Sequence, residues 1–344
     1  MAKQALKIDI FNHVLPRPYL DALQQVAGEH PVVRYASAIR PLWDSAARLR
    51  ALEPWPELRQ VLTLGQPSPE MVATPERSPR LARIANDGMA QLRDEHPDRF
   101  PAFVASLPMN NVPEALAEMD RAVEELGAAG IQVLTNINGK ALDAPDLFPI
   151  LERIAMHHRL PVWMHPYRPP TIPDYPGEGQ SEFEIWAVLN WPHETSVAMA
   201  RIVFAELYER LPDLRIITHH CGGTVPYLAG RVAYLWENIG SFTGNPRYRD
   251  IRRRMADKSL RPIDYFRRFY ADTVLSGSSA ALRCGIEFFG KEHVVFGTDF
   301  PYGPDEGLCF LREGIRALED LELSAAERQD IYSGNALRLL DARK

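Results

Sequence analysis

Eight short apolar segments, spaced along the whole chain and separated by amphipathic stretches, constrain the fold of this protein more than any other feature. Their nearly continuous apolar character is typical of strands whose two faces are both covered by other elements. The eight segments are Leu6–His13, Gln60–Leu64, Pro101–Pro108, Gly130–Ile137, Pro161–His165, Leu214–His220, Arg268–Thr273 and His293–Phe300.

The stretches between these strands have the apolar spacing of helices that cover a sheet. They are Ser78–Glu95, Val112–Leu126, Pro145–His158, Thr195–Arg210, Val225–Asn238, Ser278–Phe289 and Gly307–Leu321. A repeated strand-then-helix order favours a closed parallel (β/α)8 TIM barrel over an open doubly wound sheet. No glycine-rich phosphate loop follows a strand, which disfavours nucleotide binding. We expect one domain over residues 1–344.

Three segments exceed what a bare barrel needs. They are Leu15–Arg59 after the first strand, Tyr167–Pro192 after the fifth, and Ser241–Pro262 after the helix that follows the sixth. Long loops in compact domains are often binding loops or lids. Because the first two follow the carboxyl ends of strands, we expect them to cap the catalytic face of the barrel.

Composition excludes several other classes of protein. A formal net charge of −6 argues against a nucleic-acid surface. No apolar run is long enough to cross a membrane, and we expect no secretory signal before the first strand. Cys221, Cys284 and Cys309 lie at no metal-finger or redox spacing, so we expect reduced thiols and a cytoplasmic protein.

Polar side chains stand at the ends of four of the predicted strands. His13, His165 and His220 end the first, fifth and sixth strands, and Asp299 lies near the end of the eighth. The carboxyl ends of all strands of a parallel barrel share one face, so these residues should converge. Imidazole and carboxylate groups bind cations such as Zn²⁺ and also act as general acids and bases.

Four strings give the chain its resemblance to a known family. They are IDIFNHVLP at Ile8–Pro16, PVWMHP at Pro161–Pro166, the long stretch Asn190–Val232 that contains ITHHCGG, and VVFGTDFPYG at Val294–Gly303. In this order they resemble the amidohydrolase superfamily. The resemblance is to the branch that includes aminocarboxymuconate-semialdehyde decarboxylase and the resorcylate and carboxyvanillate decarboxylases.

The resemblance implies roles for individual residues. In that branch the first strand ends in His-x-His, and both histidines bind the metal; here Phe11 replaces the first of them. The resemblance makes His13, His165 and Asp299 the metal ligands, with Asp299 and His220 as catalytic groups. Strand alternation is expected to turn His219 toward the helices. The three remaining ligands suit a divalent cation, with Zn²⁺ as the first expectation; a site without metal stays open.

The leading hypothesis is non-oxidative decarboxylation of a small unsaturated or aromatic carboxylic acid. Arg40 would pair with the substrate carboxylate, and Trp191 and Tyr302 would contact its ring. The alternative is hydrolysis of an ester, lactone or amide by the same residues. A third reading is a barrel that only binds a small acid. The resemblance also implies a homo-oligomer.

Overall fold

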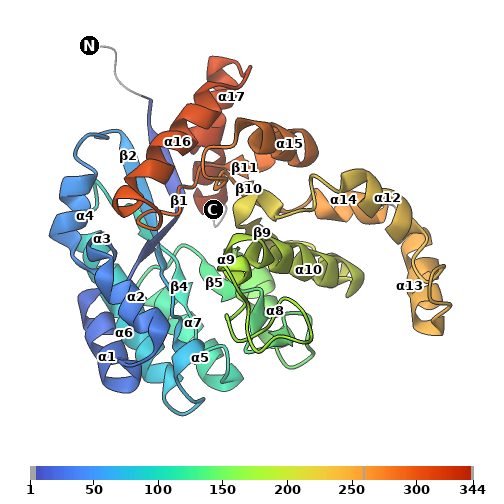
Figure 1. The fold of residues 1–344 in the computed structure, drawn as a ribbon, viewed down its shortest axis with the longest axis horizontal. Coiled ribbons are helices and arrows are strands. Elements are labelled where there is room, and N and C mark those ends of the chain that lie inside the picture. Colours follow the sequence, from blue (N-terminus) through green and yellow to red (C-terminus); the bar gives the residue numbers. More distant parts are fainter. Residues whose placement is uncertain (1–4, 259, 342–344) are drawn as a thin grey trace.

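The computed structural model describes residues 5–258 and 260–341, and these residues form a ring of parallel strands surrounded by helices (Figure 1). The strands of the ring are β1 (Lys7–Val14), β2 (Leu58–Leu64), β3 (Ala102–Phe103), β4 (Ala105–Ser106), β5 (Ile131–Leu134), β8 (Pro161–His165), β9 (Arg215–Thr218), β10 (Tyr270–Asp272) and β11 (Val294–Val295). Every neighbouring pair among them is parallel.

The ring contains eight strand positions, because β3 and β4 are two halves of one strand. Val104 between them donates its N–H to the Leu62 carbonyl, and the next residue, Ala105, donates to Gly130. The ring closes between the first and last strands, where the Ile10 N–H donates to the Phe296 carbonyl over 3.0 Å. The expected TIM barrel is confirmed, with its strands arranged in sequence order.

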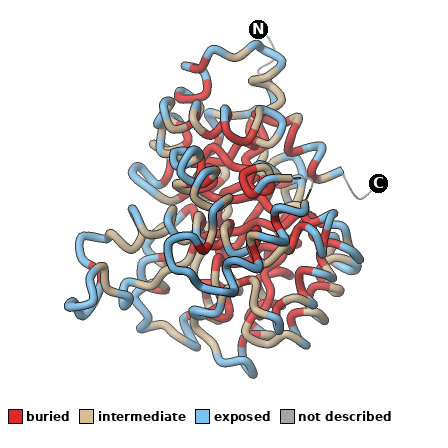
Figure 2. Tube along the Cα trace, turned by 90° about the vertical axis from the view of Figure 1, so that its right-hand side faces the viewer, coloured by how far each residue is buried: buried red, intermediate tan, exposed pale blue. Residues whose placement is uncertain are grey.

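Two apolar layers stabilise this ring. The interior of the barrel is filled by side chains from successive strands: Ile8, Ile10, Phe11, Val61, Val104, Trp163, Ile217, Val274 and Val295. A larger core lies between the strands and the surrounding helices. Figure 2 shows the buried residues gathered along the centre of the molecule and the exposed ones along its outlying segments. The interior is therefore packed, and ligands have access only at its ends.

The outer helices are close to those that the sequence predicts. They are α6 (Ser78–Glu95), α7 (Val112–Glu124), α8 (Phe148–Glu152) continued by the π-helical turn η1 (Arg153–His158), α10 (Asn190–Phe204), α12 (Ala229–Glu237), α15 (Ser279–Phe289) and α16 (Leu308–Glu319). The main difference is that α10 begins before the expected Thr195. Pro192 lies in its first turn, where a missing N–H costs no hydrogen bond.

The three extra segments have different structures. Residues 15–57 contain α1 (Arg17–Ala27), α2 (Pro31–Ala38), α3 (Arg40–Trp43) and α4 (Ser45–Ala51). Residues 167–184 are irregular and lead into α9 (Ile185–Val188), while α13 (Pro246–Ala256) projects from the barrel (Figure 1).

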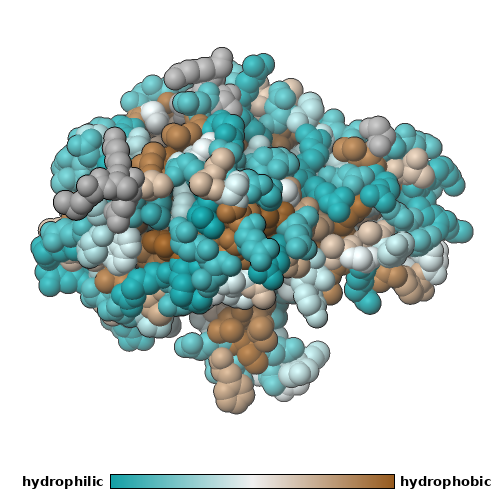
Figure 3. Space-filling view, turned by 90° about the horizontal axis from the view of Figure 1, so that it is seen from above, coloured by the Kyte–Doolittle hydropathy of each residue, from teal (hydrophilic) through white to brown (hydrophobic). Residues whose placement is uncertain are grey.

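Short elements complete the described chain. They are α5 (Pro69–Val72), β6 (Asn136–Ile137), β7 (Lys140–Ala141), α11 (Leu207–Arg210), η2 (His220–Gly222), α14 (Pro262–Phe266), η3 (Lys291–His293), η4 (Asp305–Gly307), α17 (Ala325–Gln329), η5 (Asp330–Gly334) and α18 (Asn335–Asp341). The face shown in Figure 3 is largely hydrophilic, with hydrophobic residues in small patches. Among the described residues, every helix is too short or too polar to span a bilayer.

Candidate active site

Side chains at the carboxyl ends of the strands gather above the apolar interior of the barrel. Trp163 and Ile217 fill that interior, and strand side chains alternate with a period of two. His165 and His219, each two residues later, therefore face the same way. The structure places both of them beside His13, and one ligand atom of each lies within 4.8 Å of the other two.

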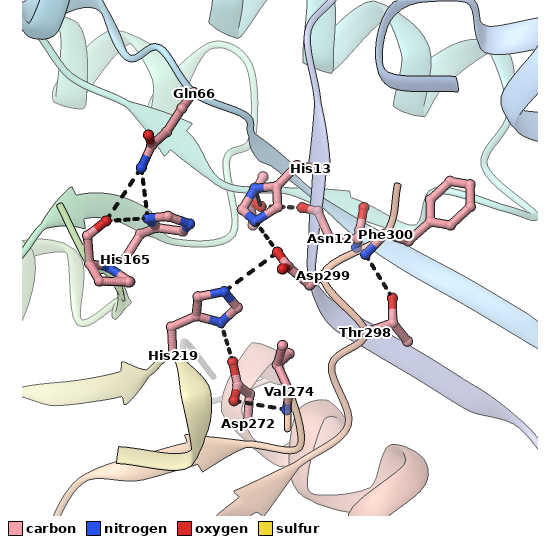
Figure 4. Close-up of polar contacts among 12 residues, drawn as sticks. Asn12, His13, Gln66, His165, His219, Asp272, Val274, Thr298, Asp299 and Phe300 are labelled. Atoms are coloured by element: carbon pink, nitrogen blue, oxygen red, sulfur yellow. Dashed lines mark hydrogen bonds and ion pairs between the residues drawn. The ribbon is translucent and has the colours of Figure 1, made fainter. Parts of the chain in front are cut away.

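His13 lies at the end of β1 and is 1% exposed. Its Nε2 is 3.0 Å from Oδ1 of Asp299, which follows β11 (Figure 4). Its Nδ1 is 3.3 Å from the hydroxyl of Thr63, and that hydroxyl donates to the Asn12 carbonyl. Nδ1 can therefore donate to that hydroxyl, and Nε2 is the nitrogen that faces the carboxylate.

His165 ends β8, and its Nδ1 likewise faces a hydrogen-bond partner. Its Nδ1 is 2.7 Å from the Pro166 carbonyl, which can only accept a hydrogen bond, so Nε2 is left with the lone pair. The side-chain amide of Gln66 lies 3.2 Å from the same Nδ1 (Figure 4). Burial lowers the pKa of His165 well below its usual value, with further contributions from His219 and His13. The imidazole is therefore neutral and available as a ligand.

The prediction that His219 points toward the helices is wrong. Its side chain is fully buried in the cluster, with Nδ1 2.5 Å from Asp272 Oδ2 and Nε2 3.5 Å from Asp299 Oδ1 (Figure 4). The physical reason is that β9 ends at Thr218, so the alternation that places Ile217 inside also places His219 inside. Asp272, at the end of β10, was not predicted either.

His220 begins the turn η2, and its backbone has a left-handed φ of 52°. The chain therefore turns away from the direction of β9 at His220. One ligand atom of His220 still lies within 4.8 Å of ligand atoms of both His219 and Asp299. Its Nδ1 is buried without a hydrogen-bond partner among the described residues. The structure therefore brings His220 to the edge of the cluster from outside the strand.

Charge within the cluster is shared between two carboxylates and the histidines. Burial opposes the charged form of His219, but Asp272 and Asp299 outweigh it and raise its pKa to about 9. Burial likewise opposes the charge on Asp299, yet His13 and His219 hold the pKa of that carboxyl well below its usual range. Asp299 is therefore ionised at neutral pH, and its side chain is 17% exposed, so the site reaches solvent.

Aromatic rings surround the cluster. Phe11 is buried beneath it, Trp191 lies edge-on to His165 at 5.6 Å between ring centroids, and Tyr302 lies 5.3 Å from the ring of His13. Two of the three residues expected to contact substrate thus border the site. Arg40 does not: its Nε donates to Asp44 over 2.9 Å and its side chain is 62% exposed, so its guanidinium forms a surface ion pair.

The donor set fits a divalent cation. Nε2 of His13 and Nε2 of His219 are buried and face Oδ1 of Asp299 at 3.0 and 3.5 Å, with no other polar partner among the described residues. Buried polar atoms are usually satisfied, so such atoms facing a carboxylate are typical of a site that takes an ion. Imidazole nitrogen with one carboxylate oxygen is a ligand set of zinc and of other first-row metals.

Comparisons with known proteins agree with this geometry. The chain is 28% identical over 356 residues to a 2-amino-3-carboxymuconate-6-semialdehyde decarboxylase from Dictyostelium discoideum, covering 98% of this chain and 92% of the relative. It resembles the crystal structure of 5-carboxyvanillate decarboxylase from Sphingomonas paucimobilis with a TM-score of 0.80 and 27% identity, covering 98% and 99% of the two chains.

A third similar protein is a dihydroxybenzoic acid decarboxylase from Polaromonas sp. JS666, whose crystal structure contains manganese and the inhibitor 2-nitroresorcinol. It matches with a TM-score of 0.75 and 24% identity, over 99% of this chain and 98% of its own, a level at which the likeness concerns the fold. A model of the amidohydrolase family (Amidohydro_2) matches residues 8–342. The chain therefore belongs to the amidohydrolase family.

Proposed function

We propose that this protein is a metal-assisted, non-oxidative decarboxylase of a small aromatic or unsaturated carboxylic acid. The observation that carries the proposal is that His13, at the barrel mouth, lies close to both other residues. One of its ligand atoms is within 4.8 Å of one on His165, and its Nε2 is 3.0 Å from Asp299 Oδ1. The decarboxylases named above resemble the chain over nearly its whole length, and this favours decarboxylation over other reactions of the same groups.

In the proposed site, His13, His165 and Asp299 hold the cation. When bound, a divalent cation polarises a substrate oxygen and so lowers the energy of negative charge developing on the substrate. Zn²⁺ suits this nitrogen-rich set, and Mn²⁺ is the ion named for the Polaromonas decarboxylase. Metal analysis of the purified protein by mass spectrometry distinguishes the two ions.

The protein groups handle the proton. Loss of CO2 breaks one carbon–carbon bond and leaves an electron pair on the ring or alkene carbon, which must then gain a proton. His220 delivers it from a ring N–H, or Asp299 passes it on after taking a proton from solvent, since both reach the cluster and Asp299 is partly exposed. Trp191 and Tyr302 form walls against which a flat acid can lie.

The decisive assay follows CO2 release and product formation in the presence of Zn²⁺ or Mn²⁺. Its substrates are gamma-resorcylate, 5-carboxyvanillate and 6-methylsalicylate, the acids named for decarboxylases that the chain resembles. Release of CO2 from at least one acid is expected. A parallel panel of lactones and esters tests the alternative, in which Asp299 deprotonates a water and His220 stabilises the oxyanion. Hydrolysis without CO2 release would establish that alternative. Tight binding of acids without turnover would indicate the third reading, a barrel that only binds them.

Asp299→Asn should abolish turnover while it leaves the fold nearly intact, because the amide keeps the shape of the carboxyl but not its charge. Steady-state kinetics and circular dichroism test this. Near-normal activity in the variant would remove Asp299 from the mechanism.

We also propose that the protein is a cytoplasmic homo-oligomer. Its cysteines are unpaired in the described chain. Large aromatic side chains stand exposed around α12, with Tyr227, Tyr234 and Phe242 at 84%, 73% and 78% exposure. Clustered exposed apolar residues are typical of surfaces that meet another protein, here a second copy. Light scattering coupled to size-exclusion chromatography should give a multiple of 38.9 kDa, and a monomeric mass would contradict this.

A further inference from the structure

The first strand of this chain lacks a residue that could bind metal two positions before His13. Phe11 holds that position, fully buried, and its ring lies flat against the imidazole of His219. The two ring centroids are 4.2 Å apart and the planes differ by 19°. His219, which stacks on Phe11, can itself bind a metal and follows a different strand, β9.

His219 is oriented as a metal ligand would be. Asp272 accepts a hydrogen bond from its Nδ1, so Nε2 is the nitrogen left to bind a cation, which would take the place of the Nε2 proton. Asp272 is itself fixed, because its Oδ1 accepts the N–H groups of Cys221 and Val274 over 2.9 and 3.1 Å. A carboxylate that holds the far nitrogen of an imidazole is the usual support of a metal-binding histidine.

The Nε2 of His219 faces the same point as the other donors. It is buried and lies 3.5 Å from Asp299 Oδ1, with no other polar partner among the described residues. The corresponding distance from His13 Nε2 to that oxygen is 3.0 Å. Ligand atoms bound to one ion at about 2.1 Å are separated by roughly 3.0–3.5 Å, so both distances match donors that share an ion.

We propose that His219, oriented by Asp272, is the metal ligand that replaces the histidine lost at Phe11. The site would then consist of His13, His165, His219 and Asp299. The inference rests on the proposed function only in assuming that a cation binds there. His220 stays free to act on substrate, since it comes from the turn η2 and is less buried than its neighbour.

The test compares metal affinity in matched variants by isothermal titration with Zn²⁺ and by metal content after dialysis. His219→Ala should weaken binding at least 100-fold, and Asp272→Asn should weaken it about 10- to 100-fold, as expected for a residue that orients a ligand. His220→Ala, the adjacent histidine, is the control and should keep wild-type affinity.

A double variant tests the replacement directly. Phe11→His combined with His219→Ala returns the ligand to the first strand and should recover most of the lost affinity. Visible absorption of the Co²⁺-loaded proteins gives a second readout that does not depend on activity, because loss of a ligand changes the band positions and intensities. Circular dichroism in the presence of chelator verifies that each variant is folded.

The outcomes separate the two proposals. Wild-type affinity in folded His219→Ala, or loss of metal only in His220→Ala, would overturn the role of His219 and leave the decarboxylase proposal standing. A wild-type protein that binds no divalent cation would overturn the role of His219 as well as the metal in the proposed function. If His219→Ala does not fold, the double variant and Asp272→Asn decide the matter.

Discussion

Arg48 is a buried, positively charged side chain that holds the backbone of the site in place. It comes from α4, is 1% exposed, and donates to the His13 carbonyl over 2.6 Å, to Asn12 Oδ1 over 2.5 Å and to Gln60 Oε1 over 2.9 Å. Gln60 in turn donates to the buried carboxyl of Asp9. The guanidinium thus fixes the backbone of a proposed ligand and balances a buried acid.

We predict that Arg48→Ala lowers the free energy of unfolding by about 3–5 kcal/mol, the usual cost of removing one partner from a buried charged network. Urea unfolding followed by circular dichroism measures this. Arg50→Ala, on the exposed side of the same helix, is the matched control and should change stability by less than about 0.5 kcal/mol. Equal effects of the two substitutions would contradict the role given to Arg48.

Glu70 leads to a prediction about pH. It is 4% exposed, its Oε2 has no hydrogen-bond partner among the described residues, and burial raises its pKa to about 7 from 4.5. Between these values the folded protein keeps a proton that the unfolded chain releases. Its contribution to the free energy of unfolding therefore falls as pH rises through this window, by about 1.4 kcal/mol per pH unit.

Glu70→Gln removes this titration while it keeps the size of the side chain. The variant should equal wild type in stability near pH 4.5 and exceed it by roughly 3 kcal/mol at pH 8. Urea unfolding at a series of pH values tests the expectation. A constant difference between the two proteins over this range would show that Glu70 does not titrate as its burial implies.

The structure brings His13 beside both His165 and Asp299, as we expected from the sequence, whereas the expected orientation of His219 is wrong. The error came from the end of the strand, which the structure places two residues earlier than expected. The expected strand extended to His220, whereas β9 ends at Thr218 and the chain turns with a left-handed φ at His220. Ile217 faces the barrel interior, so a period of two places His219 on the same inward face. The same alternation applied to the next strand would have made Asp272 a candidate site residue.

At the scale of elements, the helices after β1 reach the mouth of the barrel. Tyr35 of α2 stacks on Tyr302, with centroids 6.3 Å apart and planes within 6°. Tyr302 in turn lies beside His13. The contact between Tyr35 and Tyr302 supports our proposal that residues 15–59 cap the site. The residue of this segment that reaches the site is thus Tyr35 and not the predicted Arg40.

We predict that Tyr35→Ala raises KM about 3- to 10-fold and changes kcat less than twofold, because it removes an aromatic contact worth about 1 kcal/mol without touching the cluster. Tyr35→Phe keeps the ring and should retain the wild-type KM. Steady-state kinetics on the acid that proves to be the substrate measures both. An unchanged KM in Tyr35→Ala would show that α2 does not border the bound substrate.

The elements themselves were predictable wherever the hydrophobic period was long and uninterrupted. The helix Ser78–Glu95 and the strand Pro161–His165 have the predicted limits because proline and apolar periodicity define their ends. The segment Pro145–His158 was less regular, since helix begins only at Phe148 and its second half is a π-helical turn. Arg40 failed as a site residue because sequence spacing does not reveal which face of a short helix meets solvent.

At the scale of the whole molecule, closure of the ring makes one site from residues far apart in sequence. His13 and Asp299 meet because hydrogen bonds join the last strand to the first, among them the one from the Asp299 N–H to the Phe11 carbonyl over 2.8 Å. An ion held by β1, β8 and the segment after β11 would link three parts of the barrel. Its binding should therefore stabilise the folded chain as a unit.

We predict that excess Zn²⁺ or Mn²⁺ raises the Tm of the protein relative to a chelator-treated sample. A ligand at about 100 times its Kd adds roughly 2.7 kcal/mol to the free energy of unfolding, which corresponds to a shift of about 4 °C for a chain of this length. Scanning calorimetry measures the shift. His165→Ala, which removes one proposed ligand, should unfold at the same temperature with and without metal. If the ion raises the Tm of wild type and of His165→Ala equally, the ion binds elsewhere on the molecule. That result would contradict a metal site at the barrel mouth.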